Sequence, residues 1–330
     1  LLAVTVLLLG SPALLAQDRD AGGTATPRPV PEDPAYMTRL QIPLRGDRIG
    51  IAEAGTADLH AGEVFVCDLR GARVLIFDDR QFLRYQLTGG SVFSAPLDLA
   101  VDPEGFLLVL DGRGLHRLDF DGLPIGDFSL SGLPGDIGEP RIVSVALRPD
   151  GQRVYVLDEG NQYLWITDTD GNVLTAADLA EGLGPDQIRD QILGHVDVYG
   201  DRVLVSVPSD GMVYLHDLEG RRLGFVGLKG TGRCENAFPV AAALDVLGRV
   251  IVVDSQRALG LVWDPDGNRC LLEFAGFGGA PGRLYRPSDM ALDGDGRIYI
   301  SQGYQGRVQV YDYGTPAAGV TSQATDEPPA

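Results

Sequence analysis

The sequence is poor in the residues that build metal ribbons, covalent haem sites and nucleic-acid surfaces. It has three cysteines among 330 residues and contains no CxxC or CxxCH, which disfavours a zinc ribbon and a c-type haem. Lysine and arginine total 27 against 46 acidic residues, giving a net charge of −19. Such a surface repels phosphate backbones and anionic lipid, so we expect no nucleic-acid partner. The charge indicates a neutral, cationic or basic partner, or serves solubility alone.

Long apolar runs are also scarce, and the clearest one covers residues 1–16. It is interrupted by Gly10, Ser11 and Pro12 and ends in small residues before Gln17. A membrane span needs roughly 20 apolar residues, so this segment instead resembles the core and cleavage zone of a secretory signal whose basic start is missing. We therefore expect an exported protein of the periplasm or cell exterior, without stable membrane insertion.

The abundant residues are 44 glycines and 21 prolines, which favour short strands joined by turns. Two landmarks recur along the chain. An apolar strand ending in Asp recurs every 41 to 49 residues, and a glycine opening a β-rich run recurs every 43 to 49. A period of this length with only strands inside it predicts propeller blades. The aspartates are Asp78, Asp119, Asp168, Asp217, Asp264 and Asp312, and the glycines are Gly62, Gly105, Gly151, Gly200, Gly248 and Gly296.

The last unit, residues 282–312, carries a proline, a short apolar strand, Asp-x-x-Gly-Arg-Ile-Tyr-Ile and Arg-Val-Gln-Val-Tyr-Asp. This pattern closely resembles an NHL repeat, and residues 96–119 resemble it next best. The resemblance covers about residues 42–313 and is specific in units two, five and six. It implies an all-β fold, a six-bladed β-propeller with four-stranded blades.

The last unit supplies three strands before the chain turns at residues 314–316. Residues 36–42 are a fitting fourth strand from the N-terminal side, and pairing the two ends would close the ring and hide its edges. The expected organisation is a signal peptide over 1–16, a linker over 17–35, the propeller over 36–313 and a disordered tail over 314–330. The insertion at 176–191 predicts a short helix between blades three and four.

Ligands of propellers bind at the axial channel, near the innermost strands. Aligning these strands on the glycine that follows places Asp98, Ser144, His195 and Asp289 at equivalent positions, together with Gly55 and Ala241. Asp98, His195 and Asp289 are competent ligands for a divalent metal ion and could act in acid–base chemistry. The simpler alternative is that the aspartates bond neighbouring backbone N–H groups and that His195 is a polar rim residue.

Arg141 and Arg286 lie just ahead of two of these strands. They either hold an anion or carboxylate at the channel rim or pair with an aspartate inside it. His60, His116 and His216 fall on turns or outer strands and should not reach the channel.

Related six-bladed propellers include amidating lyases with a histidine-rich metal site and lactonases with a Glu/Asn/Asp metal site. Neither pattern is intact here, since only His195 is well placed and the four asparagines lie in turns or loops. The cysteines predict a disulfide between Cys234 and Cys270, which suits an exported protein, and a buried Cys67.

Two functions follow. The first is a non-enzymatic scaffold, without a cofactor, that binds a protein or peptide. The alternative is a metal-dependent hydrolase or lyase, lactonase-like or amidating-lyase-like, whose site lies on the axis at Asp98, His195 and Asp289.

Overall fold

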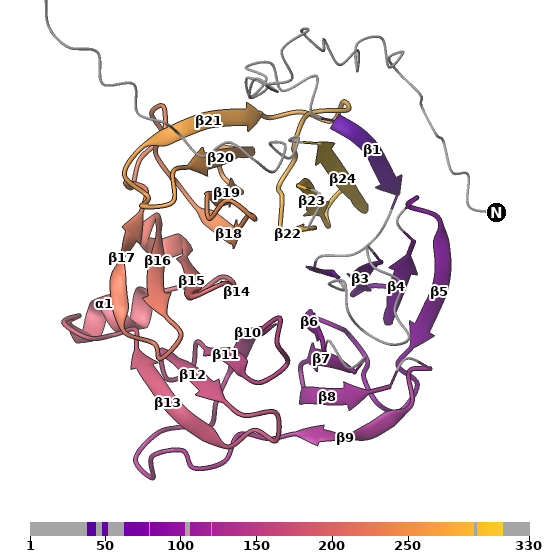
Figure 1. The fold of residues 1–330 in the computed structure, drawn as a ribbon, viewed down its shortest axis with the longest axis vertical. Coiled ribbons are helices and arrows are strands. Elements are labelled where there is room, and N and C mark those ends of the chain that lie inside the picture. The colour runs from indigo at the N-terminus through magenta and orange to yellow at the C-terminus, as the bar shows by residue number, and fades with distance from the viewer. Residues whose placement is uncertain are drawn as a thin grey trace, which may run out of the picture.

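The protein is a ring of four-stranded antiparallel sheets around a central axis (Figure 1). The computed structural model describes residues 38–43, 48–51 and 63–312, except 79, 103–105, 120 and 294–295, and only the backbone of 38–51 and 312. The predicted signal, linker and tail and His60 lie outside the described residues. Within the described part there are six sheets, which confirms the six-bladed β-propeller predicted from the sequence.

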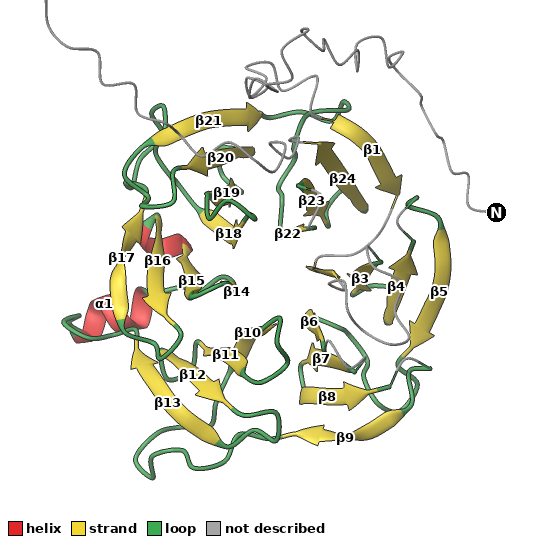
Figure 2. Ribbon diagram, in the orientation of Figure 1, coloured by secondary structure: helices red, strands yellow, loops and turns green. Residues whose placement is uncertain are grey.

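Each blade runs from an innermost strand near the axis to an outermost strand at the perimeter (Figure 2). Blade one contains β2 (Arg48–Ile51), β3 (Val64–Asp68), β4 (Arg73–Phe77) and β5 (Leu83–Thr88); blade two β6 (Asp98–Val101), β7 (Leu107–Asp111), β8 (Gly114–Leu118) and β9 (Pro124–Phe128); blade three β10 (Ile142–Leu147), β11 (Val154–Asp158), β12 (Tyr163–Thr167) and β13 (Val173–Asp178); blade four β14 (Val196–Tyr199), β15 (Arg202–Val207), β16 (Met212–Asp217) and β17 (Arg222–Val226); blade five β18 (Pro239–Leu244), β19 (Val250–Asp254), β20 (Leu259–Trp263) and β21 (Cys270–Ala275); and blade six β22 (Asp289–Leu292), β23 (Arg297–Gln302), β24 (Arg307–Asp312) and β1 (Thr38–Pro43).

The ring is closed by the two ends of the described chain. β1 pairs antiparallel with β24, with Leu40 opposite Val310 and Ile42 opposite Val308. Blade six therefore combines three strands from the C-terminal side with one from the N-terminal side, as the sequence predicts. This pairing covers an edge of β24 that would otherwise be exposed for intermolecular pairing.

The hydrophobic core lies between the blades rather than at the axis. The second strand of a blade is apolar on both faces and fully buried, as in Leu107–Asp111 and Val154–Asp158. One buried cluster fills each junction between neighbouring blades. For example, Phe65 and Val74 of blade one pack with Leu99 and Val109 of blade two. Burial on both faces explains the continuous apolar strands, since each sheet packs against two neighbours.

The turns between third and fourth strands use the aspartates that mark the repeat. The Asp217 carboxylate accepts the N–H groups of Glu219 and Arg221, and Asp264 accepts those of Asn268 and Arg269. These are local turns of the kind that Asp favours.

The alternating strand directions place two sets of connections on one face of the ring. The loops from second to third strands and the loops between successive blades leave from the same face, which we call the upper face. The predicted helix lies in such a connection, as α1 (Pro185–Asp190), and a 3₁₀ helix, η2, covers Pro208–Asp210. α1 begins later than the predicted insertion because Val173–Asp178 forms β13. No helix in the described ranges combines the length and hydrophobicity that crossing a membrane requires.

Candidate functional site

Strand pairing defines one equivalent axial position in each blade. Asp98 is opposite Leu110, Ser144 opposite Leu157, Ala241 opposite Val253 and Asp289 opposite Ser301, while the Ser206 N–H bonds the His195 carbonyl at 2.9 Å. These five sequence-predicted equivalences therefore agree with the strand register. Four of them, Asp98, Ser144, Ala241 and Asp289, stand the same distance before the glycine of the following turn, whereas His195 stands two residues nearer to Gly200.

Blade one departs from the sequence alignment. Arg48, not Gly55, takes the axial register position, opposite Cys67. The connection between β2 and β3 spans 52–63 and is longer than its counterparts, so counting back from Gly62 ends inside it. Gly55 itself lies outside the described residues.

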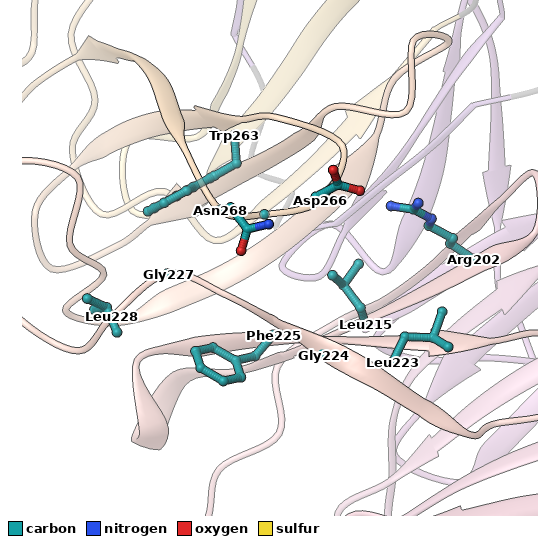
Figure 3. A pocket seen from close by; sticks show the side chains of 11 residues that line it. Arg202, Leu215, Leu223, Gly224, Phe225, Gly227, Leu228, Trp263, Asp266 and Asn268 are labelled. Atoms are coloured by element: carbon teal, nitrogen blue, oxygen red, sulfur yellow. The ribbon is translucent and has the colours of Figure 1, made fainter.

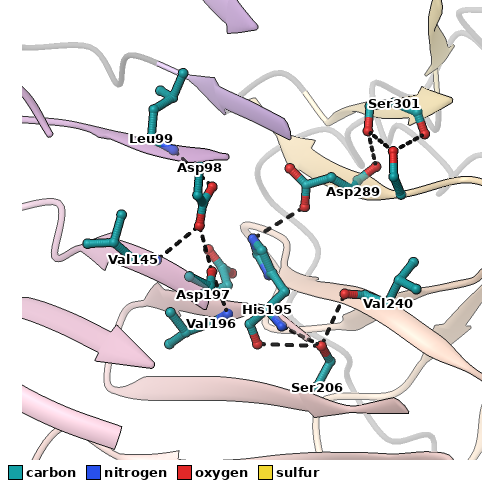
Figure 4. A network of polar contacts seen from close by, with 12 residues as sticks. Asp98, Leu99, Val145, His195, Val196, Asp197, Ser206, Val240, Asp289 and Ser301 are labelled. Atoms are coloured by element: carbon teal, nitrogen blue, oxygen red, sulfur yellow. Dashed lines mark hydrogen bonds and ion pairs between the residues drawn. The ribbon is translucent and has the colours of Figure 1, made fainter. Parts of the chain in front are cut away.

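Asp98 and Ser144 join three successive blades by hydrogen bonds (Figure 4). The Asp98 Oδ2 atom accepts the Ser144 hydroxyl at 2.7 Å and the Val145 N–H at 2.9 Å, and its Oδ1 accepts the Leu99 N–H at 2.9 Å. The Ser144 Oγ atom in turn accepts the Val196 N–H at 3.2 Å. Both side chains are buried. Asp98 thus acts as an acceptor for neighbouring N–H groups, the simpler of the two alternatives considered from sequence.

Asp197 continues this chain of contacts, and the sequence analysis missed it. Its Oδ2 accepts the Leu244 N–H of blade five at 3.1 Å. Burial raises the pKa of Asp197, against the opposing effects of His195 and the Leu244 N–H. Its side chain is partly accessible while being deeply surrounded by protein, as expected for the wall of a narrow channel. A charged residue inside an otherwise apolar innermost strand was the signal available in the sequence.

His195 and Asp289 approach each other from blades four and six. The His195 Nε2 atom lies 3.6 Å from Asp289 Oδ1, and their side chains are 11% and 0% exposed. The backbone of His195 is held by Ser206, whose Oγ accepts the His195 N–H at 2.8 Å and donates to the Val240 carbonyl at 3.2 Å. Figure 4 shows Asp98 and Asp289 on separate sides of the imidazole.

The three predicted metal ligands are thus only partly brought together. His195 meets Asp289, whereas the Asp98 carboxylate is occupied by Ser144 and two backbone N–H groups. Among the described residues, no group of three or more His, Cys, Asp or Glu side chains is placed to hold a metal ion.

The two rim arginines differ in their surroundings. Arg141 is largely exposed and its Nη1 lies 2.7 Å from Glu159 Oε2, so it is neutralised by a loop carboxylate rather than by an axial aspartate. Arg286 is exposed and forms no ion pair with any described residue. Its guanidinium lies 5.7 Å from the centre of the Tyr304 ring.

Arg286 belongs to a larger exposed patch on the upper face. The centre of the Tyr285 ring lies 5.3 Å from that of Phe277 and 5.2 Å from that of Tyr304. Phe277 is 71% exposed and Tyr304 is 65% exposed. We call Phe277, Tyr285, Arg286 and Tyr304 the aromatic patch. Its aromatic members come from two separate loops of the blade-six region, and no sequence spacing connects them, so the sequence analysis did not find it.

A cavity of about 380 Å³, largely open to solvent, lies at the channel mouth and shares Arg286 and Tyr304 with the aromatic patch. Its walls come from blades one, five and six, and Val240 and Ser288 directly precede the axial residues Ala241 and Asp289. The lining residues are Arg70, Val240, Ser255, Arg286, Pro287, Ser288, Gly303 and Tyr304.

The loops around this cavity are fixed by a polar residue at the end of the second strand. The Asp254 carboxylate accepts the Phe238 N–H at 2.9 Å, and Gln302 Oε1 accepts the Tyr285 N–H at 2.7 Å. Asp111 and Asp158 do the same for Ser94 and Arg141 in blades two and three. The repeated strand-terminal Asp was visible in the sequence, but its role in holding loops was not.

A second hollow lies at the perimeter between blades four and five (Figure 3). This groove of about 550 Å³ is bordered by exposed Leu223, Phe225 and Leu228 and by the buried Trp263, with Asp266 and Asn268 opposite. It lies on the outermost strand β17 and is remote from the axial residues.

The other two histidines that the structure describes lie on third strands, away from the axis, as predicted. His116 in β8 contacts Asp111 at 2.9 Å and Asp127 at 3.2 Å. Burial alone would raise the pKa of Asp111, but hydrogen bonds from His116, Arg113 and Ser94 outweigh it and lower this pKa to about 2. His216 in β16 is buried, and burial together with the nearby Arg222 lowers its pKa to about 4.

Cys234 and Cys270 form a disulfide with an Sγ–Sγ distance of 2.13 Å. It ties the connection before blade five to the outermost strand β21 of that blade. Cys67 is fully buried in β3 and takes the place of a small apolar residue.

Comparisons with known proteins identify the architecture alone. No protein-family model matches the sequence, and no curated protein sequence matches it. Among solved structures, the chain is similar to a protein of unknown function from Bacteroides caccae, with a TM-score of 0.54 and 16% identity, covering 74% of this chain and 88% of that one. At this identity the likeness shows a shared fold and carries no functional assignment.

Proposed function

We propose that the protein is an exported, non-enzymatic propeller of the NHL type that binds a protein or peptide on its upper face. The single observation that carries this proposal is the aromatic patch. Phe277 and Tyr304 expose most of their surface while contacting Tyr285, and Arg286 lies beside Tyr304. Exposed aromatic and arginine side chains in mutual contact are typical of the energetic centres of protein interfaces.

The axial side chains support a scaffold more than a catalyst. The side chains of Asp98 and Ser144 form hydrogen bonds to neighbouring blades, and the Asp197 carboxylate forms one between blades four and five. A catalytic base or metal ligand needs a lone pair directed at substrate or ion, whereas these oxygens accept N–H and O–H groups of the protein itself.

The NHL assignment is supported by a paired Asp and Arg in the turn after the innermost strand. Arg249 Nη2 lies 2.6 Å from Asp245 Oδ2, and Arg297 Nη1 lies 3.3 Å from Asp293 Oδ2. These pairs belong to blades five and six, two of the units in which the sequence resemblance is specific. Export is supported by the leader-like residues 1–16 and by the Cys234–Cys270 disulfide, which persists in oxidising compartments.

Affinity purification from the native host tests the proposal. The purified wild-type chain and a Phe277→Ala/Tyr304→Ala variant would be offered the same periplasmic or secreted fraction. A Leu223→Ala/Phe225→Ala variant removes comparable exposed apolar surface from the perimeter groove and is the matched control. We expect the same partner with the wild type and the control and none with the patch variant. Equal recovery by all three chains would overturn the proposed face.

A further inference from the structure

We infer that the cavity beside the aromatic patch is a carboxylate subsite, and that the partner presents a short acidic peptide segment to it. This inference rests on the proposed function and specifies the chemistry of its partner. Arg70 and Arg286 both line the cavity, the first from the β3–β4 turn of blade one and the second from the loop before β22.

Several arginines on the upper face have an internal counter-charge, whereas these two, like Arg233 and Arg283, form no ion pair within the described part of the chain. Arg113 contacts Asp111, Arg141 contacts Glu159, and Arg257 contacts Glu273, each within 3.3 Å. Arg70 and Arg286 form no ion pair with any described residue, although 46 acidic residues against 27 basic ones make a partner easy to find. Two unneutralised guanidinium groups on one cavity are suited to a carboxylate, which arginine binds through two parallel hydrogen bonds.

The nearby carboxylates do not occupy the subsite because each is already engaged. Asp68, close to Arg70 in the chain, accepts the Gly71 N–H and the Arg73 Nε–H, both at 2.9 Å. Asp254 accepts backbone N–H groups of the loop before β18. Asp289 is fully buried and faces His195.

The loops that carry the two arginines are held in place before any ligand binds. Arg70 sits in the turn fixed by Asp68, and the Tyr285 N–H is bonded to Gln302. Arg286 has a φ of 47°, a left-handed conformation that non-glycine residues adopt at a cost. Loops that are already ordered lose little conformational entropy on binding, which favours affinity.

A peptide fits these observations better than a polyanion. The overall charge of −19 repels nucleic acid and other long polyanions, so only a short acidic segment that contacts Arg70 and Arg286 directly is expected to bind. This partner differs from the neutral or basic one that the net charge alone indicates. Tyr304 lines the same cavity and continues into the aromatic patch, which offers apolar surface next to the cations. The matching ligand is therefore one or two carboxylates beside a large apolar side chain.

Selection from a random library of short displayed peptides tests the inference on the full chain. We expect enriched sequences that combine Asp or Glu with an apolar residue. A fluorescein-labelled copy of the enriched peptide and its Asn/Gln counterpart would then be titrated by anisotropy. Arg70→Gln and Arg286→Gln should each weaken binding of the acidic peptide about tenfold, as the loss of a charge-assisted hydrogen bond implies. Arg141→Gln, which removes an upper-face arginine paired with Glu159, should leave it unchanged.

The outcomes separate this inference from the proposed function. Enrichment of neutral or basic peptides whose binding requires Phe277 and Tyr304 would overturn the carboxylate subsite and leave the binding face standing. Two outcomes would overturn both the subsite and the binding face. In the first, acidic peptides bind the Phe277→Ala/Tyr304→Ala and Arg286→Gln variants as tightly as the wild type. In the second, the wild type enriches no peptide more strongly than these variants do. Circular dichroism and thermal unfolding of each variant would establish that it is folded.

Discussion

The hydroxyl of Ser144 donates a 2.7 Å hydrogen bond to the Asp98 carboxylate and receives the Val196 N–H at 3.2 Å. One serine thus connects blades two, three and four at the axis. Asp98 and Ser144, which the sequence marks as candidate binding residues, form hydrogen bonds between neighbouring blades instead.

Replacing Asp98 is therefore expected to weaken the fold more than replacing Ser144. Asp98→Ala leaves the Ser144 hydroxyl and the N–H groups of Leu99 and Val145 without their acceptor, at a cost of roughly 2–4 kcal/mol. Ser144→Ala removes one donor and one acceptor and should cost about 1–2 kcal/mol. Urea unfolding followed by far-UV circular dichroism would measure both. An Asp98→Ala variant as stable as the wild type would contradict a structural role for this carboxylate.

Acid should destabilise the protein through His216. Its pKa is lowered to about 4 in the folded protein. Between pH 6.5 and 4 this histidine is therefore protonated in the unfolded chain and neutral in the folded one. The contribution of neutral His216 to the free energy of unfolding is therefore fully present above pH 6.5 and falls as the pH decreases, by about 2–3 kcal/mol at pH 4. Asp197, whose pKa is raised, acts in the opposite sense on acidification. Comparison with His216→Phe at each pH isolates the histidine, and a stability difference between the two chains that is independent of pH would refute this account.

The Cys234–Cys270 disulfide closes a loop with a sequence separation of 36. Constraining the unfolded chain over that span should stabilise the protein by about 3–4 kcal/mol. We expect Cys234→Ser/Cys270→Ser to lose this amount in urea unfolding, and the wild type to lose it in reducing buffer. The double variant should itself be insensitive to reductant, which provides the control. A wild type that unfolds identically with and without reductant would show that the bridge adds nothing.

The axial metal alternative has a direct test. Because the Asp98 carboxylate is occupied by three protein donors, His195 and Asp289 leave too few ligands for tight binding of a divalent ion. We expect elemental analysis of the purified chain to find no stoichiometric metal, and added Zn²⁺, Mn²⁺ or Ca²⁺ to shift the thermal midpoint of the wild type and His195→Ala equally. A bound ion that is present in the wild type and lost in His195→Ala would favour the hydrolase or lyase function instead.

Removing β1 should be severely destabilising. A chain beginning at residue 44 lacks the strand that pairs with β24 along Leu40 to Pro43. It should unfold at lower urea concentration and associate through the uncovered strand edge. A chain beginning at residue 36 keeps β1 and is the matched control. Equal urea midpoints for the two chains, together with monomeric elution of both in size-exclusion chromatography, would argue against closure by this strand.

The fold was predictable from the sequence because turn-forming Asp and Gly residues and apolar strands recur at a constant period. Asp217 and Asp264 mark the ends of third strands, and each forms the local turn expected of it. The axial positions of Asp98, Ser144 and Asp289 followed from a constant distance to the next glycine, whereas the failure, Gly55 in place of Arg48, occurred where the connection is longer.

The candidate site was less predictable because it depends on contacts between distant segments. Whether Asp98 faces a ligand or a neighbouring N–H group is decided by Ser144 and Val145, which lie on another blade. Arg141 and Arg286 occupy similar places in the sequence, yet within the described residues Arg141 pairs with Glu159 and Arg286 forms no ion pair. Arg70 and Tyr304 meet Arg286 at one cavity only through ring closure, and no local pattern records that.

The bonding of β1 to β24 also sets the order of events during synthesis. Strand β1 is made before the other strands that the structure describes but has no partner until residues 307–312 have been made, so the ring stays open until its last strand is available. Closure is therefore one long-range step, and a chain that lacks residues 307–312 would leave β1 without its pairing strand.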